Sequence, residues 1–297
     1  MPPSLASVYA PALEAIDADQ VRAKETRLRG ELRNLGACLV AFSAGVDSTY
    51  LLAIARQELG SQVTAVTADS PSLARTSLAE AEAFCAAHGI THELVPTDEF
   101  SDERYVANTG LRCYACKAAL MRAMHVLLDR AAFANCALLI GALSEDFGDY
   151  RPGLQAAREA GARWPLADVG LTKDEVRWLS REHGLASWSR PAEPCLASRI
   201  PYGESVDRES LAMIEAAEQI LHAAGFPECR ARHHRIGEGK GQLCRVEVPE
   251  RDLARLLEQR EQIVQAISSL GYLHVALDLG GLQSGAFNAL VTDDEKP

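Results

Sequence analysis

The spacing of apolar residues alternates between strand and helix patterns along the first two thirds of the chain. A buried-strand run at residues 37–42 is followed by a turn of small residues and then by helix spacing from Thr49 to Leu59. The alternation continues with strand and helix patterns at 63–67, 77–88, 91–96, 117–133 and 137–141. We therefore expect an α/β fold with a doubly wound, mainly parallel sheet.

From Val206 onward the pattern changes to helix, strand, strand, helix and strand. The expected elements are 206–224, 229–236, 242–248, 251–270 and 272–278. This order predicts a smaller C-terminal α+β domain with an antiparallel sheet, and the glycines at 237–241 are typical of a hairpin turn. We predict domains at 1–188 and 206–297, joined by a proline-containing connector at 189–205.

The composition sets limits on function. A chain of 297 residues can form one large or two modest domains, and its net charge of −11 argues against a broad nucleic-acid interface. No run of 18 apolar residues appears, and the N-terminus lacks the pattern of a secretory signal. These features predict a cytoplasmic protein without a membrane partner.

The turn after the first strand has the composition of a phosphate-binding loop. It reads Ser43, Ala44, Gly45, Val46, Asp47 and Ser48. Small residues let a polyphosphate approach main-chain N–H groups, and the following helix presents its positive end. The serines add hydroxyl donors, whereas Asp47 can hold Mg²⁺ or fix the loop. The spacings of the Walker A and dinucleotide-binding loops are absent.

Polar and small residues also follow the other strands. Ala68 and Ser70 end the second strand, Gly141 ends the fourth, and Asp146 and Asp149 lie in the acidic segment beyond it. Because carboxyl ends of parallel strands share one edge, we expect these residues to bind one nucleotide, with Mg²⁺ and ribose near the acidic segment.

The sequence T-x-x-E from Thr172 to Glu175 is a capping box that opens a helix running through Glu182. Its structural role is sufficient to explain Thr172 and Glu175, whereas Lys173 could also reach a phosphate.

The eight cysteines fall into two groups. Those in apolar or alternating runs are predicted to be core residues: Cys38, Cys85, Cys136, Cys229 and Cys244. Cys113 and Cys116 form a C-x-x-C motif, which occurs in zinc, redox and iron–sulfur sites, and Cys195 is isolated.

Zinc would need a fourth ligand. The adjacent His233 and His234 are unsuitable because neighbouring residues on a strand point to opposite faces. Three thiolates suit an iron–sulfur cluster with one iron left open. Two alternatives stay open: three unrelated thiols, or Cys195 as a lone nucleophile near Arg199 or Lys117.

Three arginines are candidate anion ligands. Arg230 and Arg232 are two apart on a predicted strand and so share a face, where they and Arg199 could bind a phosphate. The alternative is a salt-bridged face with Glu218 and Glu247 as partners.

The loop S-x-G-x-D-S resembles the pyrophosphate-binding loop S-G-G-x-D-S of the N-type ATP pyrophosphatases, from which Ala44 departs at the first glycine. An alanine with positive φ at that place would be strained.

Further motifs across nearly the whole chain resemble the LarE-type sulfur transferases. They are residues 43–48, 149–154 (DYRPGL), 159–163 (EAGAR), Cys195 with 198–203 (SRIPYG), 225–227 (GFP), Arg230 with Arg232, and 277–281 (LDLGG). The resemblance implies an adenine nucleotide alpha hydrolase-like fold. It also implies ATP-dependent adenylation of a carboxylate of pyridinium-3,5-biscarboxylic acid mononucleotide, with AMP and pyrophosphate as products.

The resemblance further implies that sulfur is then installed as a thiocarboxylate, on the way to the nickel-pincer cofactor of lactate racemase. Implied site residues are Cys195, Asp47 and Arg199 for catalysis. The resemblance assigns the substrate phosphate to Ser198, Arg199, Arg230 and Arg232, and implies a homo-oligomer, a trimer or hexamer.

The family has two chemistries. One type gives up the sulfur of its own cysteine. The other has three cysteines that hold a [4Fe-4S] cluster, and the cluster carries sulfide that a separate sulfide donor provides. Cys113, Cys116 and Cys195 match the second type, and sacrificial donation from Cys195 is the alternative.

Three further functions are compatible with these residues. Two are enzymatic, a tRNA or small-metabolite thiolase and an amide-forming ATP pyrophosphatase. The third is a nucleotide-binding sensor in which the cysteines only brace the fold.

Overall fold

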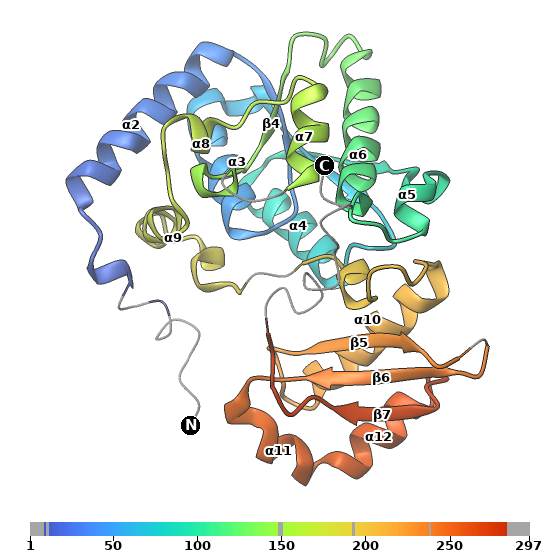
Figure 1. Ribbon diagram of the computed structural model, residues 1–297. Helices are drawn as coiled ribbons and strands as arrows, with labels where there is room; N and C mark the ends of the chain where they lie inside the picture. Colours follow the sequence, from blue (N-terminus) through green and yellow to red (C-terminus); the bar gives the residue numbers. More distant parts are fainter. Residues whose placement is uncertain (1–8, 10–11, 148–150, 192–193, 238, 284–297) are drawn as a thin grey trace. The chain divides into compact units, whose positions relative to one another are not determined.

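The first strand pattern forms β1 (Cys38–Ala41), which lies inside a four-stranded sheet in the computed structural model (Figure 1). The strand order is β3-β2-β1-β4, and every neighbouring pair is parallel. The other strands are β2 (Val63–Asp69), β3 (Thr91–Pro96) and β4 (Ala137–Ile140). The predicted α/β fold with a parallel sheet is confirmed.

The structure describes residues 9, 12–147, 151–191, 194–237 and 239–283. The chain divides into two compact units, Met1–Glu99 with Cys113–Glu193 and Phe100–Arg112 with Pro194–Pro297. The predicted boundaries at 188 and 205 remain predictions.

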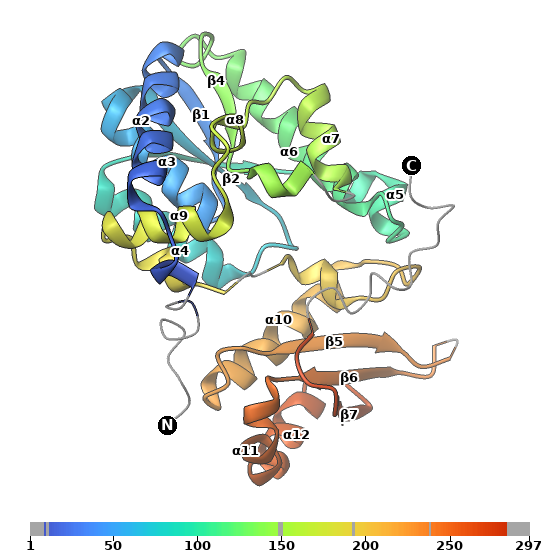
Figure 2. The same ribbon diagram turned by 60° about the vertical axis from the view of Figure 1, so that its left-hand side comes forward.

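Helices cover both faces of the sheet (Figure 2). The helices of the first unit are α2 (Ala18–Leu35), α3 (Val46–Leu59), α4 (Arg75–His88), α6 (Arg112–Leu128), α7 (Pro152–Glu159), α8 (Pro165–Asp168) and α9 (Lys173–Glu182). Alternate residues of β1 enter different cores: Val40 packs with residues of α2, α3 and α9, whereas Leu39 packs with residues of α6 and α7. Burial on both faces explains why the strands are continuous apolar runs, and the sheet is doubly wound.

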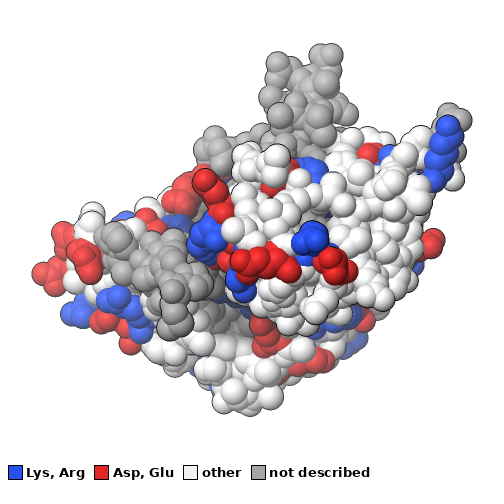
Figure 3. All heavy atoms as spheres, turned by 90° about the horizontal axis from the view of Figure 1, so that it is seen from below, with Lys and Arg blue, Asp and Glu red and all other residues white. Residues whose placement is uncertain are grey.

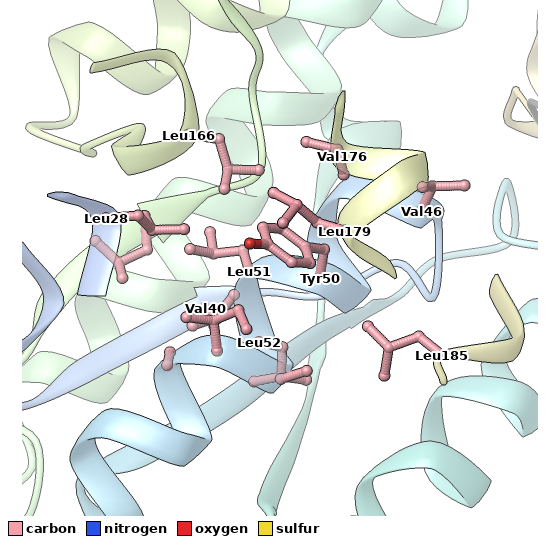
Figure 4. Packing of buried hydrophobic residues seen from close by; sticks show 14 of the residues in the cluster. Leu28, Val40, Val46, Tyr50, Leu51, Leu52, Leu166, Val176, Leu179 and Leu185 are labelled. Atoms are coloured by element: carbon pink, nitrogen blue, oxygen red, sulfur yellow. The ribbon is translucent and has the colours of Figure 1, made fainter. Parts of the chain in front are cut away.

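The core around Tyr50 anchors α3, the helix that follows the candidate phosphate loop. Figure 4 shows the Tyr50 ring between Leu51 and Leu179, close to Val176 of α9. Tyr50 is completely buried, and burial raises the pKa of its hydroxyl far above the ordinary value. This packing fixes the start of α3 relative to β1.

The second unit contains a mixed sheet of order β5-β6-β7, with β5 (Arg230–Arg235), β6 (Gln242–Glu247) and β7 (His274–Leu277). β5 and β6 are antiparallel, as predicted for the hairpin, but β7 pairs with β6 in parallel. The expected all-antiparallel sheet is therefore wrong, because a helical crossover returns the chain in the direction of β6.

The helices of this unit are α5 (Glu103–Val106), α10 (Arg208–Ala223), α11 (Leu253–Glu258) and α12 (Arg260–Ser268). The single helix predicted at 251–270 is thus two helices that meet at Gln259, whose φ of −99° and ψ of 9° interrupt helical geometry.

The polar segment 98–110 differs from the expected surface loop. It forms a short 3-10 helix, η2 (Glu99–Ser101), and α5, and two of its polar residues, Glu99 and Asn108, are completely buried. Polarity indicated exposure, but the Asn108 side chain and one carboxylate oxygen of Glu99 have buried hydrogen-bond partners.

Both signs of charge occur on the surface of the described residues. Figure 3 shows Lys and Arg side chains interspersed with Asp and Glu side chains around an uncharged area on one face. Among the described residues, no helix is long and apolar enough to cross a membrane. Cys38, Cys85, Cys229 and Cys244 are buried as predicted, and Cys136 is half-buried.

We expect His233 to make stability depend on pH. His233 is completely buried, with Nδ1 3.1 Å from the Tyr272 hydroxyl, and burial lowers its pKa from 6.5 to about 4. The unfolded chain therefore binds a proton that the folded chain does not, and stability falls as pH falls from 6.5 towards 4. The loss at pH 5 should be about 2 kcal/mol.

Urea unfolding at pH 7 and pH 5 measures this loss in wild type and in His233→Gln, which should lose less on acidification. His222→Gln, at an exposed position in α10, is the control. An equal pH dependence in wild type and His233→Gln would contradict the assignment.

Candidate active site

The candidate site of the first unit lies where the strand order reverses. The crossover from β1 leads to β2 on one side, and the chain later returns to β4 on the other side of β1. Ligands of open α/β sheets bind at the carboxyl ends of strands at such a switch point. Residues 43–48 follow β1 and residues 141–147 follow β4, so the fold brings these two predicted segments together.

The loop closes on the first turn of α3. The helix begins at Val46, three residues before the predicted start, and Gly45 is its N-cap. The Ser48 hydroxyl donates to the Gly45 carbonyl oxygen at 3.2 Å and accepts from the Ser43 N–H at 3.4 Å. Helix-initial N–H groups lack intrahelical partners, so the loop offers them to an anion.

Ala44 has a φ of 56°, which is the left-handed conformation that favours glycine. An alanine in this region is strained by about 1–2 kcal/mol. Its carbonyl oxygen accepts a hydrogen bond from Arg190 Nη1 at 3.2 Å, which helps to hold the loop. The strain expected for a positive φ is therefore present at this step of the loop.

Gly141 marks the closest approach between the two segments. A Cβ atom at this position would lie 2.9 Å from the Ser48 nitrogen and 3.0 Å from the Asp47 carbonyl carbon. These are main-chain atoms at the start of a buried helix and cannot move aside easily. A residue without a side chain is thus required where β4 ends.

Asp47 is paired with Lys173, at the start of α9. The Lys173 ammonium lies 2.9 and 2.7 Å from the two carboxylate oxygens of Asp47. Burial raises the pKa of Asp47, the Lys173 charge opposes that rise, and the Asp146 carboxylate adds to it. Lys173, suggested above as a phosphate ligand, thus contacts the Asp47 carboxylate in the candidate phosphate loop.

The local sequence explains how Lys173 is placed. Thr172 accepts a hydrogen bond from the Glu175 N–H, and the Glu175 carboxylate accepts one from the Thr172 N–H at 2.9 Å. The predicted capping box is confirmed. It fixes the first turn of α9, from which Lys173 reaches Asp47.

Asp146 lies in the segment after β4. Its Oδ2 accepts from the Leu143 N–H at 2.8 Å, and its Oδ1 is 2.6 Å from Arg151 Nη1. Asp149, also predicted to help there, lies outside the described residues. Carboxylate oxygens of Asp47 and Asp146 suit Mg²⁺, although among the described residues no three His, Cys, Asp or Glu side chains converge as a metal site.

Ala68 and Ser70 lie at the carboxyl end of β2, as expected. The Ser70 hydroxyl donates to the Glu99 carboxylate and accepts from the Ser72 N–H at 3.0 Å. Sequence reasoning missed Glu99, whose second carboxylate oxygen is buried without a hydrogen-bond partner within the described parts of the chain. Nothing in the local sequence distinguishes it from an exposed loop residue.

The C-x-x-C motif lies at the start of α6 instead of in the predicted loop. Cys113 is exposed and Cys116 half-exposed, and residues three apart share one side of a helix. A Cβ atom at Gly153, in the first turn of α7, would lie 3.3 Å from the Cys113 carbonyl oxygen. The two helices therefore approach closely at the motif.

Cys195 is exposed and immediately precedes the 3-10 helix η5 (Leu196–Arg199). Cys113 and Cys116 belong to the first unit and Cys195 to the second. Convergence of the three thiols stays a prediction.

The second unit gathers the predicted arginines. Arg199 donates through Nε and Nη2 to the Glu218 carboxylate at 2.8 and 3.0 Å. Arg232 lies 2.9 Å from Glu247 and donates from Nη1 to the Ser198 carbonyl oxygen at 2.9 Å. Glu218 and Glu247 are thus the partners that the salt-bridged alternative expected.

Arg230 lies on the same strand as Arg232. Burial lowers the pKa of Arg230, and the positive charges of Arg199 and Arg232 lower it further. Arg199 and Arg232 are paired with Glu218 and Glu247, and Arg230 adds a third guanidinium, so within these five side chains positive charge exceeds negative. Such a cluster can attract a phosphate.

A doubly wound parallel sheet with a small-residue loop at its switch point is the fold of the adenine nucleotide alpha hydrolase-like proteins. The second unit adds a small mixed sheet that carries an arginine cluster.

Comparison with known proteins identifies the family within this fold. It is 34% identical over 270 residues to pyridinium-3,5-bisthiocarboxylic acid mononucleotide synthase of Lactiplantibacillus plantarum, covering 91% of this chain and 95% of that protein. The chain therefore belongs to the LarE-type sulfurtransferase family.

Two uncharacterized proteins are also similar. One, from Synechocystis sp., is 38% identical over 92% of this chain and 99% of its own length. The second, from Methanocaldococcus jannaschii, is 23% identical over 81% of this chain and 88% of its own length. No protein-family model matches the chain.

Gly141→Ala should damage both the fold and the loop. The new Cβ would push against main-chain atoms of α3, so we expect a loss of about 1–3 kcal/mol in unfolding free energy. If the loop binds ATP as the sequence predicts, ATP affinity measured by calorimetry should also fall at least about tenfold, because the loop N–H groups are displaced. The control is Gly30→Ala in α2, where a Cβ has nothing nearer than 3.9 Å. Equal stability and ATP affinity in wild type and Gly141→Ala would contradict this view.

Lys173→Met should raise the pKa of Asp47 further and destabilise the fold by roughly 1–2 kcal/mol at pH 7. When the pKa of a carboxyl is higher in the folded than in the unfolded protein, the folded state becomes less stable as pH rises from the unfolded pKa through the folded pKa. The penalty should therefore shrink on going from pH 7 to pH 5.

Urea unfolding of Lys173→Met, Asp47→Asn and the double variant checks this. The double variant should recover much of the loss because no buried charge is left alone. Strictly additive losses would show that the two residues do not interact.

Proposed function

We propose that this protein is an ATP-dependent sulfurtransferase acting on pyridinium-3,5-biscarboxylic acid mononucleotide. It adenylates a substrate carboxylate, releases pyrophosphate and converts the acyl adenylate to a thiocarboxylate and AMP, for nickel-pincer cofactor synthesis in the cytoplasm. The observation that carries the proposal is the 34% identity over 91% of the chain to the synthase of the corresponding bisthiocarboxylic acid mononucleotide. The phosphate loop at the switch point of the sheet supports it independently.

The first unit would perform the adenylation. The N–H groups of residues 43–48 would bind the ATP phosphates, and Ala68 and Ser70 would lie beside the nucleotide. A carboxylate oxygen of the substrate attacks the α-phosphorus, and the bond to the bridging oxygen breaks as pyrophosphate leaves. Fixed N–H donors stabilise the charge that develops on the phosphate oxygens.

Mg²⁺ would be held by Asp47 and Asp146, whose carboxylates are close enough to raise the pKa of Asp47. The ion would neutralise phosphate charge when bound. Lys173 holds the Asp47 carboxylate in one orientation and so keeps the base of the loop in place.

The second unit would bind the phosphate of the mononucleotide. Ser198, Arg199, Arg230 and Arg232 are the proposed ligands. The carboxylates of Glu218 and Glu247 hold Arg199 and Arg232 in fixed directions. Preorganised guanidinium groups lose little conformational freedom when the anion arrives.

The cysteines fit an iron–sulfur cluster in their donor type and in their exposure. Cys113 and Cys116 share one side of α6 and reach the surface, and Cys195 is exposed. We propose these three as the ligands. A [4Fe-4S] cluster held by three cysteines has one iron without a protein ligand and can supply sulfide there. A sulfide donor and assembly into a trimer or hexamer belong to the same proposal.

The test is an anaerobic assay with ATP, the pyridinium mononucleotide and sulfide that measures pyrophosphate and thiocarboxylate separately. Cys113→Ala, Cys116→Ala and Cys195→Ala should release pyrophosphate within about threefold of the wild-type rate and form almost no thiocarboxylate. Cys136→Ser, at a half-buried position, is the control and should form both products.

Full thiocarboxylate formation by Cys113→Ala would refute the cluster. Pyrophosphate release that needs tRNA instead of the pyridinium substrate would favour a tRNA thiolase.

A further inference from the structure

Arg190 lies beside the strained step of the candidate phosphate loop. Its Nη1 donates to the Ala44 carbonyl oxygen at 3.2 Å, and its Nη2 donates to the Ser77 hydroxyl at 3.4 Å. The same guanidinium forms an ion pair with Glu80 of α4. The Arg190 side chain is only 17% exposed. Removing a guanidinium from water is costly, so these acceptors hold it in one position.

Arg177 holds the backbone that carries Arg190. It lies in α9 and is 4% exposed. Its Nη1 donates to the Trp188 carbonyl oxygen at 2.5 Å, and its Nη2 donates to the Arg190 carbonyl oxygen at 2.9 Å. A buried cation thus fixes the chain on both sides of Ser189, and Arg190 starts from a defined place.

Helix α9 therefore supports the candidate phosphate loop at two points. Lys173 contacts the Asp47 carboxylate directly. Arg177 lies four residues later on the same side of the helix and acts on Ala44 through Arg190. Burial raises the pKa of Asp47, and the charges of Lys173 and Arg177 oppose that rise, so both cations lie near the loop.

The hydrogen bond from Arg190 determines which way one peptide group of the loop faces. The peptide bond between Ala44 and Gly45 is trans, so the Gly45 N–H points opposite to the Ala44 carbonyl oxygen and away from Arg190. If this peptide group turned over, its oxygen would face the anion in place of the N–H. The φ of 56° already strains Ala44. The loop consequently needs an interaction that stabilises the orientation it has.

We propose that Arg190 is a positioning residue that keeps the Gly45 N–H directed at the phosphates of ATP, with Arg177 holding Arg190 in place. The purpose of this arrangement rests on the proposed function, of which ATP binding by the loop is a part. The contacts themselves do not rest on it, and all of them lie within the first unit.

The first test compares the binding of ATP, inorganic pyrophosphate and adenosine by calorimetry. Arg190→Gln should lower the affinities for ATP and pyrophosphate about tenfold, because the loop no longer holds a donor toward the anion. Adenosine has no phosphate, so its affinity should stay within about twofold of wild type. General damage to the fold would weaken all three ligands alike.

The second test asks whether Arg190 acts through Ala44 or contacts the phosphates itself. Glycine adopts a positive φ without strain, so Ala44→Gly should stabilise the native loop conformation. The double variant Ala44→Gly/Arg190→Gln should therefore bind pyrophosphate at least about threefold more tightly than Arg190→Gln alone. A direct phosphate ligand could not be replaced in this way.

Arg190→Lys keeps the charge and should fold even if Arg190→Gln does not. A lysine lacks the planar fork that reaches Ala44, Ser77 and Glu80 together, so we expect a loss of about threefold in pyrophosphate affinity. Ala44→Gly should recover this loss as well. Circular dichroism melting of each variant reports folding.

The matched control is Arg122→Gln in the same unit. Arg122 forms an ion pair with Asp98 in which both side chains are exposed. Its replacement should leave the affinities for ATP and pyrophosphate unchanged. Equal pyrophosphate affinity in wild type and the folded Arg190 variants, or a loss that Ala44→Gly does not recover, would overturn the positioning role.

The outcomes also separate the two proposals. Pyrophosphate binding that depends on Arg190 and is recovered by Ala44→Gly, in a protein that forms no thiocarboxylate, would uphold the positioning role and refute the proposed function. Thiocarboxylate formation and ATP affinity that folded Arg190→Gln leaves unchanged would uphold the proposed function and refute the positioning role. A wild-type protein that binds neither ATP nor pyrophosphate would overturn both.

Discussion

The end of β4 approaches the first turn of α3 so closely that position 141 has no room for a side chain. The rest of the first unit depends on this contact, because it places the segment after β4 against the loop after β1 at the switch point of the sheet. The hydrophobic core around Tyr50 packs against α3, and Ala44 adopts a left-handed conformation in the turn that precedes this helix. The candidate phosphate loop is therefore preformed, and anion binding need not order it.

Both units arrange buried charge in the same way. Asp47 is neutralised by Lys173 in the first unit, and Arg199 and Arg232 are held by Glu218 and Glu247 in the second. Breaking such pairs leaves an uncompensated charge, so each partner keeps the other in a fixed orientation. In the proposed reaction the Asp47–Lys173 pair serves nucleotide binding and the two Arg–Glu pairs serve binding of the substrate phosphate, which gives the ion pairs a role beyond stability.

Much of the first unit could be predicted because its signals are local. Buried strands are short apolar runs, β3 has the predicted bounds, and the capping box at Thr172 opens α9 as expected. The predictions that were wrong concern long-range geometry. The parallel pairing of β7 depends on a crossover, and the burial of Glu99 and Asn108 depends on partners about 30 to 90 residues away. The Lys173 contact with Asp47 likewise joins residues far apart in sequence. The polarity of neighbouring residues gives no information about such distant partners. The family resemblance predicted site residues only where this chain carries the family's sequence motifs.

The central claim is that sulfur reaches the substrate without consuming the protein. The most direct measurement is the intact mass of anaerobically prepared protein after turnover with ATP, sulfide and the pyridinium mononucleotide, together with the amount of thiocarboxylate formed. The account predicts several thiocarboxylates per chain and an unchanged protein mass. A yield limited to one thiocarboxylate per chain, with loss of the mass of H₂S from Cys195, would contradict it and show that this cysteine is the sulfur donor.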